Sequence, residues 1–262
     1  MQIAGEEAVG YYMTTYPAFI FFISLVQFGL PIAVTKIVAE AYANKAFPQI
    51  AGVMKTVFLF TALCSIVILP LLFLISPFVA QSWLKNEDLA LLLKLSIVAI
   101  PFVLFASIFK AYLQGLLKIT PTAFAQLFEQ LLRIGLIIFI LPELSSDKSA
   151  IQLAAIVMLF TVLSELCSFV ILFISYTKNR ISQQVAKAYP LKPILHHALP
   201  AQGSKLFGTF TWFLEPIVFL QALTASGITA AAATTLYGVI SGVFVPLLLF
   251  PAFFARNIEC FS

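Results

Sequence analysis

The chain has 262 residues, of which 61% are hydrophobic and only 10% are charged, with a formal net charge of +4. Its mean hydropathy is +1.04. Soluble domains are about half apolar and about a quarter charged. The composition therefore excludes an ordinary water-soluble fold and predicts an all-α integral membrane protein.

Seven apolar segments are long enough to cross a bilayer as helices, which takes about 20 residues each. In chain order we expect them at residues 12–35, 54–78, 89–113, 121–142, 150–176, 199–222 and 231–255. Helices are expected because lipid cannot satisfy exposed backbone groups. The protein is thus predicted to be a bundle of about seven transmembrane helices.

Basic and non-basic loops alternate between these segments. The first, third and fifth loops, with their flanks, carry Lys36, Lys45, Lys55, Lys110, Lys118, Lys178, Arg180, Lys187 and Lys192. By the positive-inside rule these loops face the cytoplasm. Met1 would then lie outside the cell, and one further helix upstream is the simpler account. Together with the abrupt change in character after residue 255, this predicts a fragment of a longer protein.

The longest polar stretch, residues 178–197, is basic and contains two prolines. It predicts a cytoplasmic linker between two halves of a bundle. We therefore divide the chain into a first lobe at 1–180, a linker at 181–198 and the start of a second lobe at 199–262.

A stripe of polar residues lies within the segment 121–142, which otherwise is typical of a membrane helix. Their spacing of i, i+3, i+4 and i+7 places on one helical face the side chains of Gln126, Glu129, Gln130 and Arg133. A charge near a helix centre costs about 2.5–3.5 kcal/mol on insertion scales, so this face is expected to meet protein or water. Two interpretations stay open. The stripe is either an ion pair that joins two helices or the wall of a polar cavity, in which Arg133 binds a phosphate with its planar guanidinium.

Three more ionisable residues lie deep in later segments: Glu165 in the fifth, and Lys205 and Glu215 in the sixth. They are candidates for structural pairs between helices or for the groups that couple a carrier to H⁺ or Na⁺. By contrast, we assign three lysines at helix ends to lipid headgroups and leave them out of the site: Lys36, Lys110 and Lys118.

No Gly-rich phosphate loop, hydrolase elbow or metal-ligand spacing occurs in the sequence. We expect neither an enzyme nor a cofactor, apart from a coupling H⁺ or Na⁺, and no nucleic acid partner.

Three stretches resemble the polysaccharide-transporter branch of the MOP (multidrug/oligosaccharidyl-lipid/polysaccharide) superfamily, and within it the stage V sporulation protein B group, related to the MurJ-type lipid II flippases. The first is GEEAVGYYMTTYPAFIFFISLVQFGLPIAVTKIVAE, which is similar to the second helix of that group. The second is KAYLQGLLKITPTAFAQLFEQLLRI, which is similar to the junction between its fourth and fifth helices. The third is ASGITAAAATTLYGVISGVFVPLLLFPAFF, which is similar to its eighth helix with the preceding loop.

The resemblance implies a partial two-lobed MOP/MATE-like bundle that holds helices two to eight, in a bacterial plasma membrane. It implies a flippase that moves undecaprenyl-linked peptidoglycan or polysaccharide precursors from the inner to the outer leaflet by alternating access. The partners would be the bilayer and a lipid-linked sugar pyrophosphate bound in a cationic cavity, with no indication of the oligomeric state. The Glu-Gln-x-x-Arg pattern of the group falls on Glu129, Gln130 and Arg133, and its acidic position in the seventh helix on Glu215.

Two alternatives remain open. One is a drug or metabolite exporter of the same superfamily, which would rely on carboxylates rather than on Arg133. The other is a seven-helix membrane protein that transports nothing.

Overall fold

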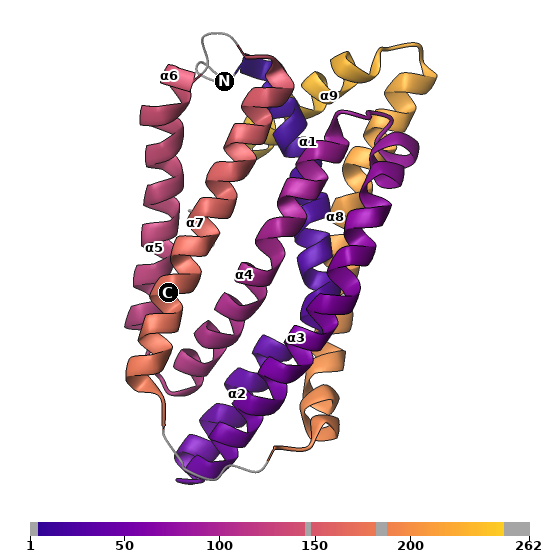
Figure 1. Ribbon diagram of the computed structural model, residues 1–262. Helices are drawn as coiled ribbons and strands as arrows, with labels where there is room; N and C mark the ends of the chain where they lie inside the picture. Colours follow the sequence, from indigo (N-terminus) through magenta and orange to yellow (C-terminus); the bar gives the residue numbers. More distant parts are fainter. Residues whose placement is uncertain (1–4, 145–147, 182–187, 249–262) are drawn as a thin grey trace, which may run out of the picture.

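The computed structural model describes residues 5–144, 148–181 and 188–248, which form an elongated bundle of helices (Figure 1). Within these residues every regular element is helical. Seven helices in the described ranges are long and apolar enough to cross a membrane. The predicted all-α fold with about seven transmembrane helices is therefore confirmed.

The elements in chain order are α1 (Gly5–Gln27), α2 (Leu30–Ala43), α3 (Phe47–Phe78), η1 (Val79–Trp83), α4 (Leu89–Gly115), α5 (Thr120–Gly135), η2 (Leu136–Ile140), α6 (Leu141–Leu144), α7 (Ala150–Asn179), α8 (Leu191–Ala225), α9 (Ala230–Val239) and η3 (Ile240–Phe244). The three η elements are π-helical turns. Each continues the helix before it, so α3 with η1, and α5 with η2 and α6, each form one crossing.

The first predicted span, residues 12–35, is wrong because the structure breaks it in two. α1 ends at Gln27, and the next two residues have left-handed backbones, with φ of 48° at Phe28 and 67° at Gly29. α2 then starts afresh and runs on toward the same end of the bundle (Figure 1). The hydropathy of the sequence does not reveal this break because the residues around it are apolar.

Local chemistry explains why the break falls there. Glycine accepts a positive φ at little cost. A side chain at Gly29 would in addition overlap the carbonyl oxygen of Ala198 in α8. Pro31 follows in the first turn of α2, where its missing N–H removes no helical hydrogen bond. The Gly-Leu-Pro sequence thus ends one helix and starts the next.

The connections alternate between the two ends of the bundle, as the charge pattern predicts. The α2–α3 and α4–α5 turns lie at one end, together with the end of α7 and the start of α8 (Figure 1). The α3–α4 and α8–α9 turns and the start of α1 lie at the other. The basic loops therefore share one end, which the positive-inside rule places in the cytoplasm.

α4 lies at the centre of the bundle and packs against α1, α2, α3 and α7. Its residues are mostly apolar, as expected of a helix that packs against several others. α3 instead turns much of its apolar surface outward, with residues such as Leu59, Ile66 and Leu74 largely exposed. In a bilayer that surface contacts lipid.

α1 and α9 approach each other closely through two glycines. A Cβ atom on Gly238 would overlap the backbone of Gly10, and one on Gly10 would overlap that of Thr234. Small residues permit such contacts between membrane helices. The first and last described helices are therefore held together by a backbone contact.

Other predicted boundaries also shift. α8 begins at Leu191, so residues 191–198 of the predicted linker are helical. Pro190 at the N-cap and Pro193 in the first turn are compatible with a helix start. Prolines are equally typical of a linker, so the sequence alone does not distinguish the two. Residues 182–187 and 249–262 lie outside the described ranges. The division into lobes at 180 and 198 stays a prediction.

Candidate functional site

Two groups of polar side chains lie inside the bundle. The first, here called the ion cluster, consists of Glu129 and Arg133 of α5 and Glu165 of α7. Arg133 Nη2 lies 2.9 Å from Glu129 Oε1 and 3.4 Å from Glu165 Oε1. The three side chains are only 15–16% exposed. One cation is thus shared by two carboxylates, which leaves a formal charge of −1.

The ion cluster follows from the helical spacing of α5 and from its packing against α7. Glu129 and Arg133 are four residues apart in the favourable Glu-before-Arg order, so they meet on one helical face. Glu165 is brought to them by the contact of α5 with α7. Arg133 Nε is buried and has no hydrogen-bond partner in the part of the chain that the structure describes.

The predicted four-residue stripe is therefore split. Glu129 and Arg133 turn inward, whereas Gln126 and Gln130 are exposed. A helical face is wider than the contact that one neighbouring helix covers, so residues at its edge stay outside.

Aromatic residues of α1 lie beside the ion cluster. The Tyr12 hydroxyl is 3.4 Å from Thr161 Oγ1 of α7. The Tyr12 and Tyr16 ring centroids are 5.7 Å apart, and Tyr16 meets Trp212 of α8 edge-on at 5.9 Å. These rings connect α7, α1 and α8, so Trp212 contributes to helix packing.

The second group lies at the break between α1 and α2. It lines a cavity of about 220 Å³, here called the break cavity, that is bounded by Gln27, Gly29, Pro31, Ile32, Ser107, Lys110, Gln114, Gln202 and Lys205. The residues come from α1, α2, α4 and α8. Two of them are lysines and none is acidic, so the cavity is cationic.

Hydrogen bonds hold the wall of the break cavity in place. Lys205 Nζ donates to Gln27 Oε1, and Gln27 Nε2 donates to Ser107 Oγ at 3.0 Å. Gln202 Nε2 donates to the carbonyl oxygen of Ser24. The N-terminus of α2 also borders the cavity, and the partial positive charge of a helix N-terminus favours an anion.

The predicted site residues are thus distributed over three environments. Glu129, Arg133 and Glu165 form the ion cluster, and Lys205 lines the break cavity. Glu215 is exposed on α8. With Gln126 and Gln130, it takes part in neither group.

Sequence reasoning missed Lys110, Gln27 and Ser107. The assignment of Lys110 to lipid headgroups is wrong, because its side chain lines the break cavity from α4. Lys118 follows the end of α4 and donates to Asn179, whereas Lys36 is exposed in the middle of α2 rather than at a helix end. The signal that could have found the cavity was the Gly-Leu-Pro sequence, because interrupted membrane helices are typical of transporter binding sites.

A multi-pass helical bundle with an interrupted helix, a cationic cavity and buried carboxylates has the features of a secondary transporter. Comparison with known proteins identifies the family of the chain. The chain belongs to the polysaccharide biosynthesis protein family, whose model matches residues 2–256. The predicted family resemblance is confirmed, as is a multi-pass bacterial membrane protein.

Two curated relatives come from Bacillus subtilis (strain 168). Stage V sporulation protein B is 30% identical over 264 residues, which cover 97% of this chain and 51% of that protein. Sporulation protein YkvU is 25% identical over 264 residues, covering 97% of this chain and 56% of the relative. The chain therefore spans about half the length of the curated relatives it matches.

One solved structure shares the fold, that of a multidrug resistance MATE family transporter of the MOP superfamily in an inward-facing conformation. The TM-score is 0.67 with 15% identity, and the match covers 94% of this chain and 56% of that one. At this identity the match shows the fold alone.

Proposed function

We propose that this chain forms part of a carrier that moves lipid-linked polysaccharide or peptidoglycan precursors from the inner to the outer leaflet. The observation that supports this function best is the charge of the break cavity, which is lined by two lysines and no carboxylate. A pyrophosphate head is the part of such a substrate that carries negative charge. Ligand pockets for whole molecules usually measure about 300–1,000 Å³, so a cavity of this size takes the head rather than the sugar or the lipid chain.

In this proposal Lys110 and Lys205 bind the pyrophosphate from opposite sides. Lys110 belongs to α4 of the predicted first lobe, and Lys205 belongs to α8 at the start of the predicted second lobe. An anion bound between them favours the conformation in which α8 lies close to α4. A ligand that binds one conformation more tightly shifts the equilibrium toward it, as alternating access requires.

The ion cluster is assigned a different role. Both oxygens near Arg133 Nη2 belong to carboxylates, so Arg133 neutralises Glu129 and Glu165 in this proposal and does not bind the substrate phosphate. The remaining negative charge suits a proton or a Na⁺ ion. Intramembrane carboxylates commonly mark such coupling sites.

A drug or metabolite exporter is the second candidate. The buried carboxylates and the fold that the chain shares with a multidrug transporter favour it. A cationic drug would bind at the ion cluster and would be repelled by the lysines of the break cavity. The two functions therefore depend on different residues.

Transport assays on the full-length gene product in proteoliposomes test the proposal. A fluorescent undecaprenyl-pyrophosphate sugar is placed in one leaflet, and its appearance in the other is followed. Lys205→Gln should slow translocation, whereas Lys192→Gln, which removes an exposed charge from the same helix, should leave it unchanged.

Three outcomes would contradict the flippase. Ethidium efflux that depends on Glu129 and Glu165 but not on Lys205 would favour the exporter. Equal loss in Lys205→Gln and Lys192→Gln would show a general charge effect. A wild-type protein that moves neither substrate would support the non-transporting alternative.

A further inference from the structure

A second cationic pocket lies near the predicted cytoplasmic end of the bundle, outside the site described above. This basic pocket has a volume of about 380 Å³ and is lined by Ile50, Ala51, Met54, Lys55, Phe58, Tyr112, Tyr176, Arg180 and Ile181. These residues belong to α3, α4, the last turn of α7 and the two residues that follow it. Neither α8 nor α9 contributes, so the basic pocket is separate from the break cavity.

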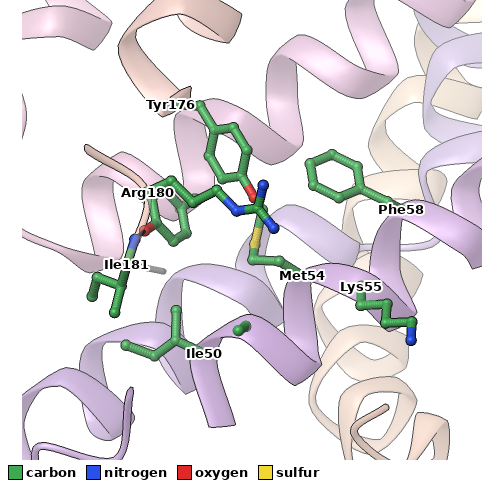
Figure 2. A pocket seen from close by; sticks show the side chains of 9 residues that line it. Ile50, Met54, Lys55, Phe58, Tyr176, Arg180 and Ile181 are labelled. Atoms are coloured by element: carbon green, nitrogen blue, oxygen red, sulfur yellow. Dashed lines mark hydrogen bonds between the residues drawn. The ribbon is translucent and has the colours of Figure 1, made fainter. Parts of the chain in front are cut away.

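The Arg180 side chain dominates the basic pocket. In Figure 2 its guanidinium extends over Met54 and beside Tyr176, while the ammonium of Lys55 points away from it toward the rim. Arg180 forms no salt bridge with any residue that the structure describes. Its charge is therefore not neutralised by the protein itself within the described ranges.

The backbone on both sides of Arg180 is held in place. The Tyr112 hydroxyl donates to the carbonyl oxygen of Asn179 at 3.1 Å and accepts from the Ile181 N–H at 3.1 Å. A single buried tyrosine of α4 thus binds the residues before and after Arg180. The backbone that carries the Arg180 side chain is therefore fixed by these two hydrogen bonds.

An apolar groove adjoins the basic pocket and shares Phe58 and Tyr176 with it. This aromatic groove has a volume of about 580 Å³ and is lined by Phe58, Leu59, Ala62, Phe105, Phe109, Phe169, Phe173 and Tyr176. Its rings pack on one another, with centroids 5.0 Å apart for Phe109 and Tyr176 and 5.3 Å for Phe58 and Phe109. The groove therefore has a rigid apolar floor.

The basic pocket and the aromatic groove follow each other along α3 and α7. From Lys55 to Ala62 on α3, and from Tyr176 back to Phe169 on α7, the helices rise by about 10 Å at 1.5 Å per residue. The cationic end lies at the predicted cytoplasmic surface, and the groove leads from it toward the bilayer centre. Leu59 is 71% exposed and Phe173 is 46% exposed, so the groove opens to the outside of the bundle.

We infer that this surface binds an anionic phospholipid of the cytoplasmic leaflet, with its phosphate at Arg180 and one acyl chain in the aromatic groove. A charge that the protein leaves unpaired next to an apolar groove matches a molecule with an anionic head and a hydrocarbon tail. Basic pockets between helices on the cytoplasmic side bind lipid head groups of this kind. An arginine can form two hydrogen bonds to one phosphate.

The chemistry of a polyprenyl phosphate is similar, but the position of the groove favours the phospholipid. The carried substrate must pass between the lobes in the proposed function, and the helix that starts the predicted second lobe does not line this surface. The bound lipid instead contacts α3, α4 and α7 together. Its binding therefore does not depend on transport.

Native mass spectrometry of the delipidated full-length protein tests this site. Phosphatidylglycerol is compared with phosphatidylcholine that has the same acyl chains, and undecaprenyl phosphate is added as a competitor. The wild type should bind phosphatidylglycerol preferentially, and Arg180→Gln should weaken that binding by about tenfold, as expected for the loss of a charge-assisted contact.

Two matched controls separate this site from general effects. Lys178→Gln removes the same charge two residues earlier, where the side chain is exposed outside the basic pocket, and should leave binding unchanged. Ala62→Phe fills the groove and should weaken binding without changing the charge, whereas Leu63→Phe, on the lipid-facing surface outside the groove, should not. Ala62→Phe also tests the site independently if Arg180→Gln lowers the unfolding temperature of the lipid-free protein.

Several results would overturn the inference. Equal binding of the two phospholipids, or equal weakening by Arg180→Gln and Lys178→Gln, would show that no specific headgroup site exists. Unchanged binding in Ala62→Phe would remove the acyl-chain site. Displacement of phosphatidylglycerol by undecaprenyl phosphate that is present at a lower concentration than phosphatidylglycerol would assign the surface to the polyprenyl chain.

Discussion

The ion cluster and the break cavity both place charge inside the bundle but differ in how that charge is balanced. In the ion cluster the cation of Arg133 is shared by Glu129 and Glu165. In the break cavity Lys205 contacts only the neutral amide of Gln27 among the hydrogen bonds described above, and no carboxylate lines the wall. In the proposed function, the partner of a membrane charge therefore decides whether that charge is free to bind a ligand.

The largest effect is expected where this balance is removed. Arg133→Leu leaves two buried carboxylates without a cation and should destabilise the protein by about 3–5 kcal/mol, the usual cost of breaking a buried pair. Thermal unfolding in detergent measures this loss. Adding Glu129→Gln and Glu165→Gln to the same variant should restore most of the stability. Failure of that rescue would mean that Arg133 has a further partner.

A somewhat smaller effect is expected at the helix break. Gly29→Ala forces a side chain onto a left-handed backbone and against the Ala198 carbonyl, and should cost about 2–4 kcal/mol. Gly203→Ala in α8 is the matched control because a Cβ atom there meets nothing within 4 Å. Unfolding midpoints of the two variants check this prediction. Equal midpoints would show that the break tolerates a side chain.

The break cavity itself should respond through binding rather than through stability. Lys205→Gln keeps a donor for Gln27 but removes the charge, so pyrophosphate should bind about tenfold more weakly. Lipid-linked pyrophosphate binding by the purified protein, measured by fluorescence, checks this change, with Lys192→Gln as the control. The result would be contradicted if Arg133→Lys, which keeps the charge of the ion cluster, weakened binding as much.

The smallest effect is expected at the exposed edge of the α5 stripe. Gln126→Leu and Gln130→Leu should change the unfolding free energy by no more than about 0.5 kcal/mol, as is usual for exposed positions away from a special contact. They should also leave transport unchanged. A loss of transport in either variant would place the whole stripe in a polar cavity, which is one of the two interpretations that the sequence leaves open.

The distribution of hydropathy predicted most of the fold. The number of crossings and their order along the chain follow from it because lipid forces each apolar segment of this length into a helix. The ends of the helices were less predictable. Leu191 begins a helix within a polar, proline-containing stretch, and Gly29 interrupts one within an apolar stretch, so composition was misleading at both.

Part of the candidate site was also predictable. The pair of Glu129 and Arg133 follows from helical spacing alone. Glu165 is 32 residues from Arg133 in the chain, and Lys110 is 95 residues from Lys205. No local pattern connects residues so far apart.

The sequence by itself determined that the protein is a multi-pass helical bundle, which end carries its basic loops, and which residues place charge in the membrane. These properties depend on the free energy of transferring each segment from water to lipid, which is determined by the composition of that segment alone. Only the tertiary structure decided which charges become partners, that Lys110 and Lys205 share a cavity, and that Arg180 lies beside an aromatic groove. These contacts depend on how helices pack, and packing is decided jointly by side chains from several distant segments.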